Sequence, residues 1–584
     1  MSHPAAESSI SIERRHSPEA IADEIAIFEA RMGQLRRGEI TDDEFRPFRL
    51  KHGIYGQRQP GVQMVRVKVP SGVLICDQLR VLAKIADTYS TGRGHVTTRE
   101  NIQFHFVKME NVPAVMRLLA DAGLTTREAC GNTVRNVTSC PLAGICPGES
   151  FDVTPYALGV TRFLLRHPDF HDLPRKFKIA FSGCEDDGNC AVAGIHDIGL
   201  IARVKVADGS PCRGFKVLVG GGLGSLPTEA ATLTEFLPEE ELLPMIEAVL
   251  RVFLDHGNRK NKYKARLKFV LREKGIEQLR NLVEEKRKTV ETPAQLFTRP
   301  SAVAQPLVNI GPAPASIPLS PEYEHWLQSN VMPQRQSGWA AIWIKLAAGG
   351  ITSSQLRGLA DLLQRNRLPG IRVAILQDFL IPWVRREQLP QLHQDLRALQ
   401  LTAPGARTIA DVTACPGATT CNLGITRSLT LAEELASLLA DQSDPEILKL
   451  RIKISGCPNS CGQHHIADIG LYGNARKIGN RQAPFYQLLL GGEVSGNGVR
   501  FGKQLMVVAA KQVPQTIQAL LEFYQHDRRD SEAFRVWLAR TPEDAIVRRL
   551  RPYAEPPENS EDNFLDWGDS EKYSLQLGRG ECAT

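Results

Sequence analysis

Two cysteine-bearing blocks, each occurring twice, constrain the fold of this 584-residue chain more than any other feature. The block DVTACPGATTCNLG around Cys415 matches RNVTSCPLAGICPGE around Cys140, which lies 275 residues earlier. The block around Cys457 matches the block around Cys184 at an offset of 273 residues. Landmarks that return in one order at nearly one offset indicate an internal duplication. We therefore expect two similar halves.

The segments before the cysteine blocks predict the same elements in each half. Residues 64–69 alternate as a strand does, 71–89 have helical spacing, 95–107 predict a second strand and 111–124 a second helix. The same order returns in residues 341–401. The predicted fold class is therefore α/β (α+β), with two halves that are each an α/β sandwich unit followed by a strand-rich, metal-binding lobe.

Local composition marks the domain limits. Ser17-Pro18 is a helix start, whereas Thr292–Pro321 holds seven prolines and predicts a connector. The tail after Arg551 is polar and acidic. We predict these segments: helical extension 1–45, first α/β unit 46–128, first lobe 129–291, connector 292–330, second α/β unit 331–405, second lobe 406–551 and tail 552–584.

The overall composition argues against several classes of protein. There is no run of 18 apolar residues and no secretory signal pattern at the start, so we expect no membrane association. Twelve cysteines, many in close pairs, favour metal binding in a reducing cytoplasm over a disulfide scaffold. The net charge of +6 is too small to indicate nucleic-acid binding. It suits an anionic cofactor, an anionic substrate and an acidic electron carrier.

The second-half cysteines form two tight pairs among Gly and Pro residues. Cys415 and Cys421 are a C-x5-C pair, and Cys457 and Cys461 are a C-x3-C pair. Thiolates are soft ligands for iron, and small residues let the backbone wrap an iron–sulfur cluster and donate N–H groups to its sulfurs. Zinc competes, although zinc pairs usually read C-x2-C to C-x4-C. A zinc-held structural module and a disulfide framework are therefore the alternatives.

The two spacings together, with SGCPNSCG around the second pair, closely resemble the sulfite/nitrite reductase family over about Arg46 to Arg551. The resemblance implies a ferredoxin-like α/β sandwich unit and a mixed-sheet siroheme and cluster lobe in each half. It implies a [4Fe–4S] cluster on Cys415, Cys421, Cys457 and Cys461. It also implies that Cys461 bridges this cluster to the iron of siroheme.

The resemblance further implies an anion site in the first half, lined by Arg66, Arg135, Lys176 and Lys178. A small oxyanion that gives up its water needs such fixed cations. Lys176 and Lys178 alternate along a predicted strand and should therefore point to one face. Siroheme carries eight carboxylates, and by sequence context the candidates for its rim are Arg99, Gln103 and Asn136.

The implied activity is the six-electron reduction of sulfite to sulfide. No flavin or NADPH module is recognisable in the chain, so we expect electrons from ferredoxin or a similar carrier. Lys178 favours sulfite, because plant-type nitrite enzymes of the family usually have Asn at the matching position. Ferredoxin-dependent reduction of nitrite to ammonia is the main alternative, and a tetrapyrrole-modifying enzyme of the precorrin-3B synthase type is a more distant one.

Two features go beyond the shared pattern of the family. Tyr55 and Cys130 match positions that some family sulfite reductases join as a thioether, so we predict this crosslink. The first half keeps a complete cysteine set, namely Cys140, Cys146, Cys184 and Cys190, which would allow a second cluster. A two-residue insertion in the second pair and the negative charge of Glu185 argue against it, so structural or redox-inert thiols are the alternative. We expect no catalytic role for Cys582 in the tail.

Overall fold

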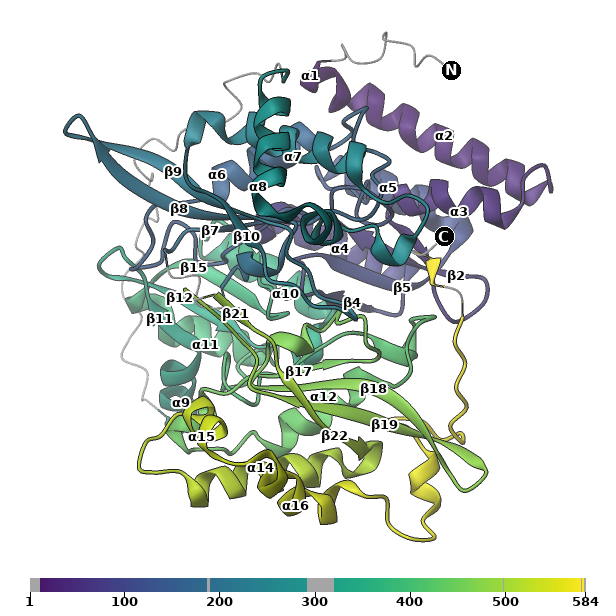
Figure 1. Ribbon diagram of the computed structural model, residues 1–584. Helices are drawn as coiled ribbons and strands as arrows, with labels where there is room; N and C mark the ends of the chain where they lie inside the picture. Colours follow the sequence, from purple (N-terminus) through teal and green to yellow (C-terminus); the bar gives the residue numbers. More distant parts are fainter. Residues whose placement is uncertain (1–10, 186–189, 291–319, 497, 579, 582–584) are drawn as a thin grey trace.

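The computed structural model describes residues 11–185, 190–290, 320–496, 498–578 and 580–581. The two halves lie one above the other in Figure 1, with the first half in purple to teal and the second in green to yellow. Each half has an α/β unit and a lobe, as the internal duplication predicts.

Each half contributes one strand to the α/β sheet of the other half. The first sheet has the order β1-β2-β5-β4-β13, in which β13 (Gly350–Thr352) comes from the second half. The second sheet has the order β11-β12-β15-β14-β3, in which β3 (Val73–Leu74) comes from the first half. The other strands are β1 (Ile54–Gly56), β2 (Val62–Val67), β4 (Arg93–Val96), β5 (Ile102–Lys108), β11 (Val331–Pro333), β12 (Trp339–Ile344), β14 (Ile371–Val373) and β15 (Phe379–Arg385).

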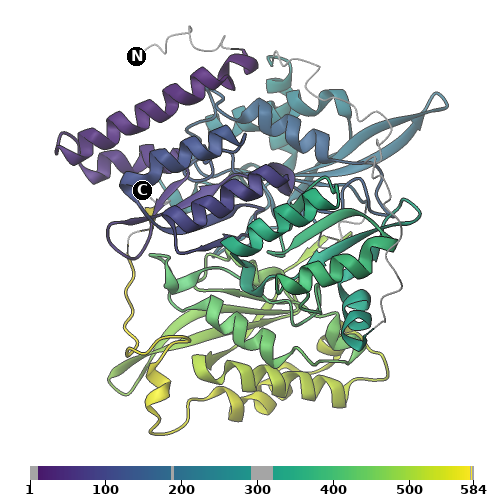
Figure 2. The same ribbon diagram turned by 180° about the vertical axis from the view of Figure 1, so that it is seen from behind.

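Helices cover one side of these two sheets (Figure 2). They are α4 (Cys76–Tyr89) and α5 (Val112–Asp121) in the first half, and α10 (Ser353–Arg365) and α11 (Leu389–Ala398) in the second. Helices α4 and α10 pack side by side across the boundary between the halves. Their apolar residues recur at helical spacing, so both helices bury one face in a single core that runs through both units.

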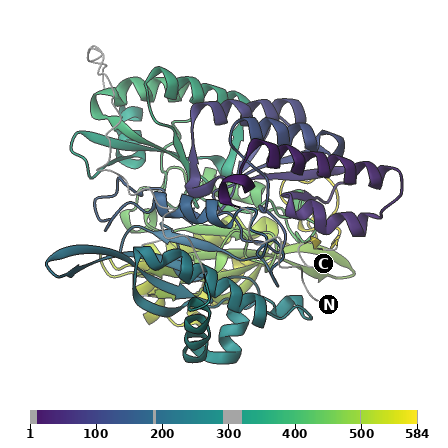
Figure 3. The same ribbon diagram turned by 90° about the horizontal axis from the view of Figure 1, so that it is seen from above.

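The two lobes lie on the opposite side from these helices, as the view from above shows (Figure 3). Each lobe has one mixed five-stranded sheet with its own hydrophobic core. The first sheet comprises β6 (Thr138–Ser139), β7 (Ile179–Ser182), β8 (Ile198–Ala207), β9 (Ser210–Val219) and β10 (Ala231–Pro238). The second comprises β16 (Thr413–Ala414), β17 (Ile452–Ser455), β18 (Ile469–Ile478), β19 (Arg481–Leu490) and β22 (Lys503–Ala509). The helices α7 (Leu242–His256) and α8 (Leu267–Arg287) pack in the first lobe, and α12 (Ser428–Leu438), α14 (Val513–Asp527) and α16 (Glu543–Ala554) pack in the second.

The predicted single strand over residues 95–107 is wrong, because a turn interrupts it. The hydroxyl of Thr97 accepts hydrogen bonds from the backbone N–H groups of Arg99 and Asn101, each at 3.2 Å. Glu100 has a φ of 54°, which a continuous strand does not allow. This local side-chain bonding competes with strand pairing, and it turns Arg99 toward the centre of the molecule.

The N-terminal extension and the end of the predicted connector contain helices. The extension forms α1 (Ile12–Arg15), α2 (Pro18–Arg36) and α3 (Asp42–Lys51). Most of the predicted connector lies outside the described residues, and its last ten positions form α9 (Pro321–Asn330). In the described part of the chain, no helix combines the length and the apolar character needed to cross a membrane.

Candidate active site

The second-half cysteines lie at the carboxyl ends of two parallel strands. Cys415 follows β16 and Cys457 follows β17, and these strands pair with Thr413 opposite Lys453. Parallel neighbours end at the same edge of a sheet, so the two C-terminal loops meet there. Cys421 and Cys461 are the second cysteines of these same loops.

The backbone wraps these thiols closely. Gly456 donates its N–H to the Sγ of Cys415 at 3.2 Å, and Cys421 and Cys457 also accept backbone hydrogen bonds. A Cβ on Gly456 would collide with Gly417, so glycine is what lets the two loops touch. Burial and the charge of the neighbouring Cys461 raise the pKa of Cys421 to about 12. Metal ligation offsets the free-energy cost of deprotonating such a buried thiol, because a coordinated thiol is held deprotonated.

Single-ion sites are absent from the described part of the chain. No group of three or more His, Cys, Asp or Glu side chains there can hold a metal ion. A structural zinc needs four ligands around one ion, whereas a four-iron cube takes one cysteine for each iron. Four cysteine donors on two adjoining loops fit a [4Fe–4S] cluster, in which each iron takes one cysteine.

Arg66 and Arg135 converge on one backbone carbonyl. Both donate an Nη1–H to the oxygen of Ala129, at 3.3 and 3.2 Å. Arg66 also donates from Nε and Nη2 to Oε1 of Gln103, which lies opposite it in the pairing of β2 and β5. Arg135 is buried and donates twice more to the oxygen of Gly131. Two guanidinium groups predicted to bind one anion are thus held beside each other.

Lys178 lies within electrostatic reach of Cys461, the thiol that is predicted to bridge the two cofactors. Burial, with the positive charges of Arg99 and Lys176, lowers the pKa of Lys178 well below its usual value, and the charge of Cys461 opposes that shift. Strand β7 begins only at Ile179, so both lysines precede the observed strand and the prediction that they lie within it is wrong.

Alternation nevertheless holds around these lysines, because the backbone between them is already extended. The buried Phe177 forms a bridge with Val134, while Lys176 and Lys178 are only half-buried. Both lysine side chains therefore leave the chain on the face opposite Phe177.

Residues 97–101 bring the rim candidates against the cluster loop. Thr98 donates its hydroxyl to the carbonyl of Cys461 at 2.9 Å, which joins the two halves at this point. Arg99 Nη2 donates to the carbonyl of Asn136 at 2.6 Å. Among the described residues, the buried Arg99 Nε and Asn136 Oδ1 have no hydrogen-bond partner. The orphaned Nε–H of Arg99 is a donor beside several cations, which fits a macrocycle with a rim of carboxylates, whereas the Asn136 oxygen can only accept a hydrogen bond.

Sequence reasoning missed the residues that position these cations. Asp197 accepts a hydrogen bond from the backbone N–H of Lys178 at 2.8 Å and two from Arg266, at 3.0 and 2.8 Å. His196 accepts one from Arg99 at 2.9 Å. The Asp-Ile-Gly tripeptide at Asp197 returns at Asp468, and this repeat was the available signal.

The predicted crosslink partners lie in one small apolar cluster. Tyr55 packs against a cluster that contains Cys130 and Met64. The Sγ of Cys130 also accepts a hydrogen bond from Arg66 at 3.3 Å, so this cluster adjoins the anion site. The first-half cysteines gather as well, whereas Cys582 lies outside the described residues.

The chain matches two family models, each of them twice. The nitrite and sulphite reductase 4Fe-4S domain matches residues 130–290 and 405–555. The nitrite/sulfite reductase ferredoxin-like half domain matches residues 55–122 and 332–399.

Individual relatives match along most of their length. A ferredoxin sulfite reductase of Mycolicibacterium paratuberculosis is 30% identical over 521 residues, which cover 85% of this chain and 88% of that protein. An assimilatory ferredoxin-dependent nitrite reductase of Haloferax mediterranei is 29% identical, with 91% and 92% covered. The solved structure of the Mycobacterium tuberculosis NirA protein superposes with a TM-score of 0.76 at 27% identity and covers 92% of this chain and 96% of that one.

Proposed function

The chain belongs to the nitrite and sulfite reductase family, and we propose that within this family it reduces sulfite to sulfide with electrons from ferredoxin. It is an oxidoreductase with siroheme and a [4Fe–4S] cluster as cofactors. When bound, these two groups supply the electrons and the iron that holds the substrate. The residues of the chain bind the anion, orient it and supply protons.

One observation carries the choice of sulfite, namely the position of Lys178. It lies within electrostatic reach of Cys461 and among the positive charges of Arg99, Lys176 and Arg266. Sulfite carries more negative charge than nitrite near neutral pH, and a fourth cation stabilises the more highly charged anion more strongly. The bound anion also restores the proton affinity of Lys178, which can then donate a proton to a departing oxygen.

Arg66 and Arg135 act differently from Lys178 in this proposal. Their guanidinium groups share the carbonyl of Ala129, and Gln103 fixes the plane of Arg66. Such fixed guanidinium groups suit the orientation of an oxyanion, because little reorganisation is needed when charge develops.

The test compares the two products with reduced ferredoxin as electron donor. We expect the purified holoenzyme to have a higher kcat/KM for the reduction of sulfite to sulfide than for the reduction of nitrite to ammonia. The proposal of sulfite as substrate is overturned if ammonia formation has the higher kcat/KM. Nitrite reduction would then be the activity, in line with the nitrite reductases among the relatives.

The variant Lys178→Asn tests the residue itself. We expect kcat/KM for sulfite to fall about 10-fold to 100-fold, the cost of a hydrogen bond to a charged group, and that for nitrite to fall less. Lys205→Asn, an exposed position on β8, is the matched control and should change neither value. Equal losses for both anions in Lys178→Asn would contradict a role in selectivity.

A further inference from the structure

The internal duplication places a second group of cations in the second half. Lys449 and Arg451 lie 273 residues after Lys176 and Lys178, two of the cations predicted for the first-half anion site. Arg451 donates its backbone N–H to an aspartate at 2.9 Å, as Lys178 does at 2.8 Å. The second half therefore carries an internal copy of the lysine-bearing part of that site.

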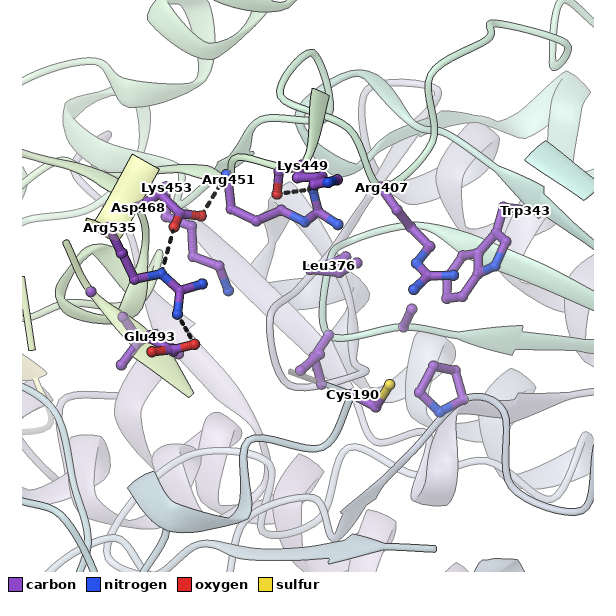
Figure 4. Close-up of a pocket in the computed structure, with 15 residues that line it drawn as sticks. Cys190, Trp343, Leu376, Arg407, Lys449, Arg451, Lys453, Asp468, Glu493 and Arg535 are labelled. Carbon is purple, nitrogen blue, oxygen red and sulfur yellow. Dashed lines mark hydrogen bonds and ion pairs between the residues drawn. The ribbon is translucent and has the colours of Figure 1, made fainter. Parts of the chain in front are cut away.

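These cations line a pocket between the two halves (Figure 4). Pro141 and Cys190 line it from the first half, and all its other lining residues come from the second. Figure 4 shows Lys453, Arg451 and Arg407 in a row across from Cys190. The volume of about 110 Å³ has room for several water molecules or one small oxyanion, and it is too small for a tetrapyrrole.

Positive side chains outnumber carboxylates in the lining of this pocket. The cations are Arg407, Lys449, Arg451, Lys453 and Arg535. The carboxylates are Asp468 and Glu493, and both form ion pairs with Arg535. Among the described residues, no carboxylate lies within 4.0 Å of the charged groups of Arg407, Arg451 or Lys453. The lining therefore has three positive side chains without a paired carboxylate.

Lys453 is the most deeply buried of these cations, with 4% of its surface exposed. Its ammonium group has three N–H donors, and among the described residues only Oε1 of Gln463 accepts one, at 2.7 Å. Burial, and then the positive charge of Arg451, lowers the pKa of Lys453 to about 7, whereas the charges of Asp411 and Asp468 oppose that shift. A bound anion would accept the remaining donors and restore the proton affinity of the amine.

The guanidinium groups of Arg451 and Arg407 also keep donors for a ligand. Arg451 donates from Nη1 to the carbonyls of Lys449 and Leu450, each at 3.1 Å, and no described residue accepts from its Nη2. Arg407 lies over the indole of Trp343, with Cζ 5.4 Å from the ring centroid. Contact with an aromatic ring uses the face of a guanidinium and leaves its N–H edge for an oxyanion.

The pocket is not a second site of reduction. Trp343 and Ala410 stand at the positions of Arg66 and Arg135, so both guanidinium groups predicted to orient the substrate are missing. The small volume also leaves no space for the macrocycle on which the substrate would be reduced. What the copy can still do is bind an anion.

Two cations of the pocket stand at positions that are uncharged in the first half. Arg407 and Lys453 take the places of Asn132 and Ala180. Cations gathered in one partly buried pocket repel one another, and burying a charge is costly unless it is paired. An anion in the pocket removes both costs.

We propose that this pocket binds one small, doubly charged oxyanion of the sulfate, phosphate or sulfite class, held by Arg407, Arg451 and Lys453. The site differs from the one at which the substrate is reduced, and it does not depend on which substrate that is. Because the pocket exists only in the folded chain, the bound anion also stabilises the fold.

Anomalous diffraction from crystals of the holoenzyme soaked in selenate locates the ligand directly. We expect a selenium peak in the pocket, with selenate oxygens about 3 Å from Nζ of Lys453 and from the guanidinium of Arg451. An empty pocket would show that these charges are balanced within the chain and would overturn the proposal. This experiment on the unaltered protein does not depend on whether any variant folds.

Equilibrium dialysis of the holoenzyme with labelled sulfate measures the affinity. We expect Lys453→Met to weaken binding in the pocket about 10-fold to 100-fold, the cost of a hydrogen bond to a charged group. Lys477→Met, at an exposed position on β18, is the matched control and should bind as the unaltered protein does. Only the binding that Lys453→Met removes belongs to this pocket. Equal binding by a folded Lys453→Met variant and the unaltered protein would contradict the proposal.

Competition against the labelled sulfate defines the class of anion. Phosphate and sulfite should displace it at lower concentrations than nitrate, whose single charge should require a concentration about 10-fold higher. If sulfite displaces it at a lower concentration than phosphate does, the ligand shares the chemistry of the proposed substrate, and the reverse order identifies phosphate. Equal competition by nitrate would overturn the selection of a doubly charged anion.

Discussion

At the scale of single residues, the site is organised by side chains that hold other side chains. Asp197 fixes the backbone of Lys178 and the guanidinium of Arg266 at once. Gln103 holds the guanidinium of Arg66 by accepting a hydrogen bond from its Nη2. These partners do not need to touch a substrate to matter, because an anion site depends on cations that do not reorganise during the reaction.

The crosslink between Tyr55 and Cys130 stays a prediction at this scale. The two residues pack in one apolar cluster beside Arg66. We expect peptide mass spectrometry of the holoenzyme to find them joined by a C–S bond, with one hydrogen lost from the Tyr55 ring and one from the Cys130 thiol in a two-electron oxidation whose oxidant is dioxygen. The Cys130→Ala variant should contain only unmodified Tyr55. Recovery of unmodified Tyr55 from the unaltered holoenzyme would show that no bond forms.

At the scale of elements, the exchange of β3 and β13 joins the halves. Gly72 precedes β3 and has a φ of +69°, and a Cβ there would collide with the carbonyl of Val373 in the second half. Gly349 precedes β13 and has a φ of +74°, and a Cβ there would collide with the carbonyl of Val96 in the first half. The duplicated glycines allow each exchanged strand to approach the foreign sheet.

Substitution of Gly72 by Ala should therefore destabilise the junction between the halves. We expect the free energy of unfolding to fall by about 2–5 kcal/mol, from the left-handed backbone and from the clash together. Gly123→Ala is the matched control, because its φ is +70° and nothing lies within 4 Å of the added Cβ. Denaturant unfolding of both variants separates the cost of the left-handed backbone from the cost of the clash with Val373. Equal losses of unfolding free energy in the two variants would mean that the clash costs nothing.

The buried histidine of β4 should make the fold sensitive to acid. Burial lowers the pKa of His95 to about 4, and its neighbour Gln377 donates a hydrogen bond to the ring at 3.3 Å. The folded state thus keeps His95 neutral, whereas in the unfolded chain it takes up a proton below about pH 6.5. The unfolding free energy should fall between pH 6.5 and 4, by up to about 1.4 kcal/mol per pH unit for this residue.

Urea unfolding at several pH values checks this expectation. The His95→Gln variant should show a shallower dependence on pH than the unaltered protein. His256→Gln, at an exposed position at the end of α7, should leave the slope unchanged. A slope that His95→Gln does not alter would place the acid sensitivity elsewhere.

At the scale of the whole molecule, duplication has divided one task between two halves. The first half supplies Arg66, Arg135 and Lys178, and the second supplies the cluster loops around Cys461. Residues 97–101 of the first half contact Cys461, which brings the two sets together at this point. Neither half alone brings the cations and the cysteines of the proposed site together.

The charge of the whole molecule should govern its reaction with ferredoxin. A net charge of +6 favours encounter with an acidic carrier, and salt screens this attraction beyond about 10 Å at 0.1 M. We expect the kcat/KM for ferredoxin to fall several-fold between about 0.05 M and about 0.5 M NaCl, because screening becomes strong over this range. With a small uncharged reductant the rate should change little. Equal salt dependence with both donors would argue against electrostatic steering.

The sequence by itself determined the duplication, most of the strands and helices, and the two cysteine loops of each half. These features depend on spacing along the chain, which reflects local periodicity and short loops. Only the tertiary structure decided the turn at 97–101, the exchange of β3 and β13, and the meeting of Lys178 with Cys461. The strand exchange and the approach of Lys178 to Cys461 join residues that are far apart in the chain, so they depend on how two packed surfaces fit rather than on any local pattern. The turn at 97–101 is held by local hydrogen bonds to Thr97, which override the alternating pattern of a strand.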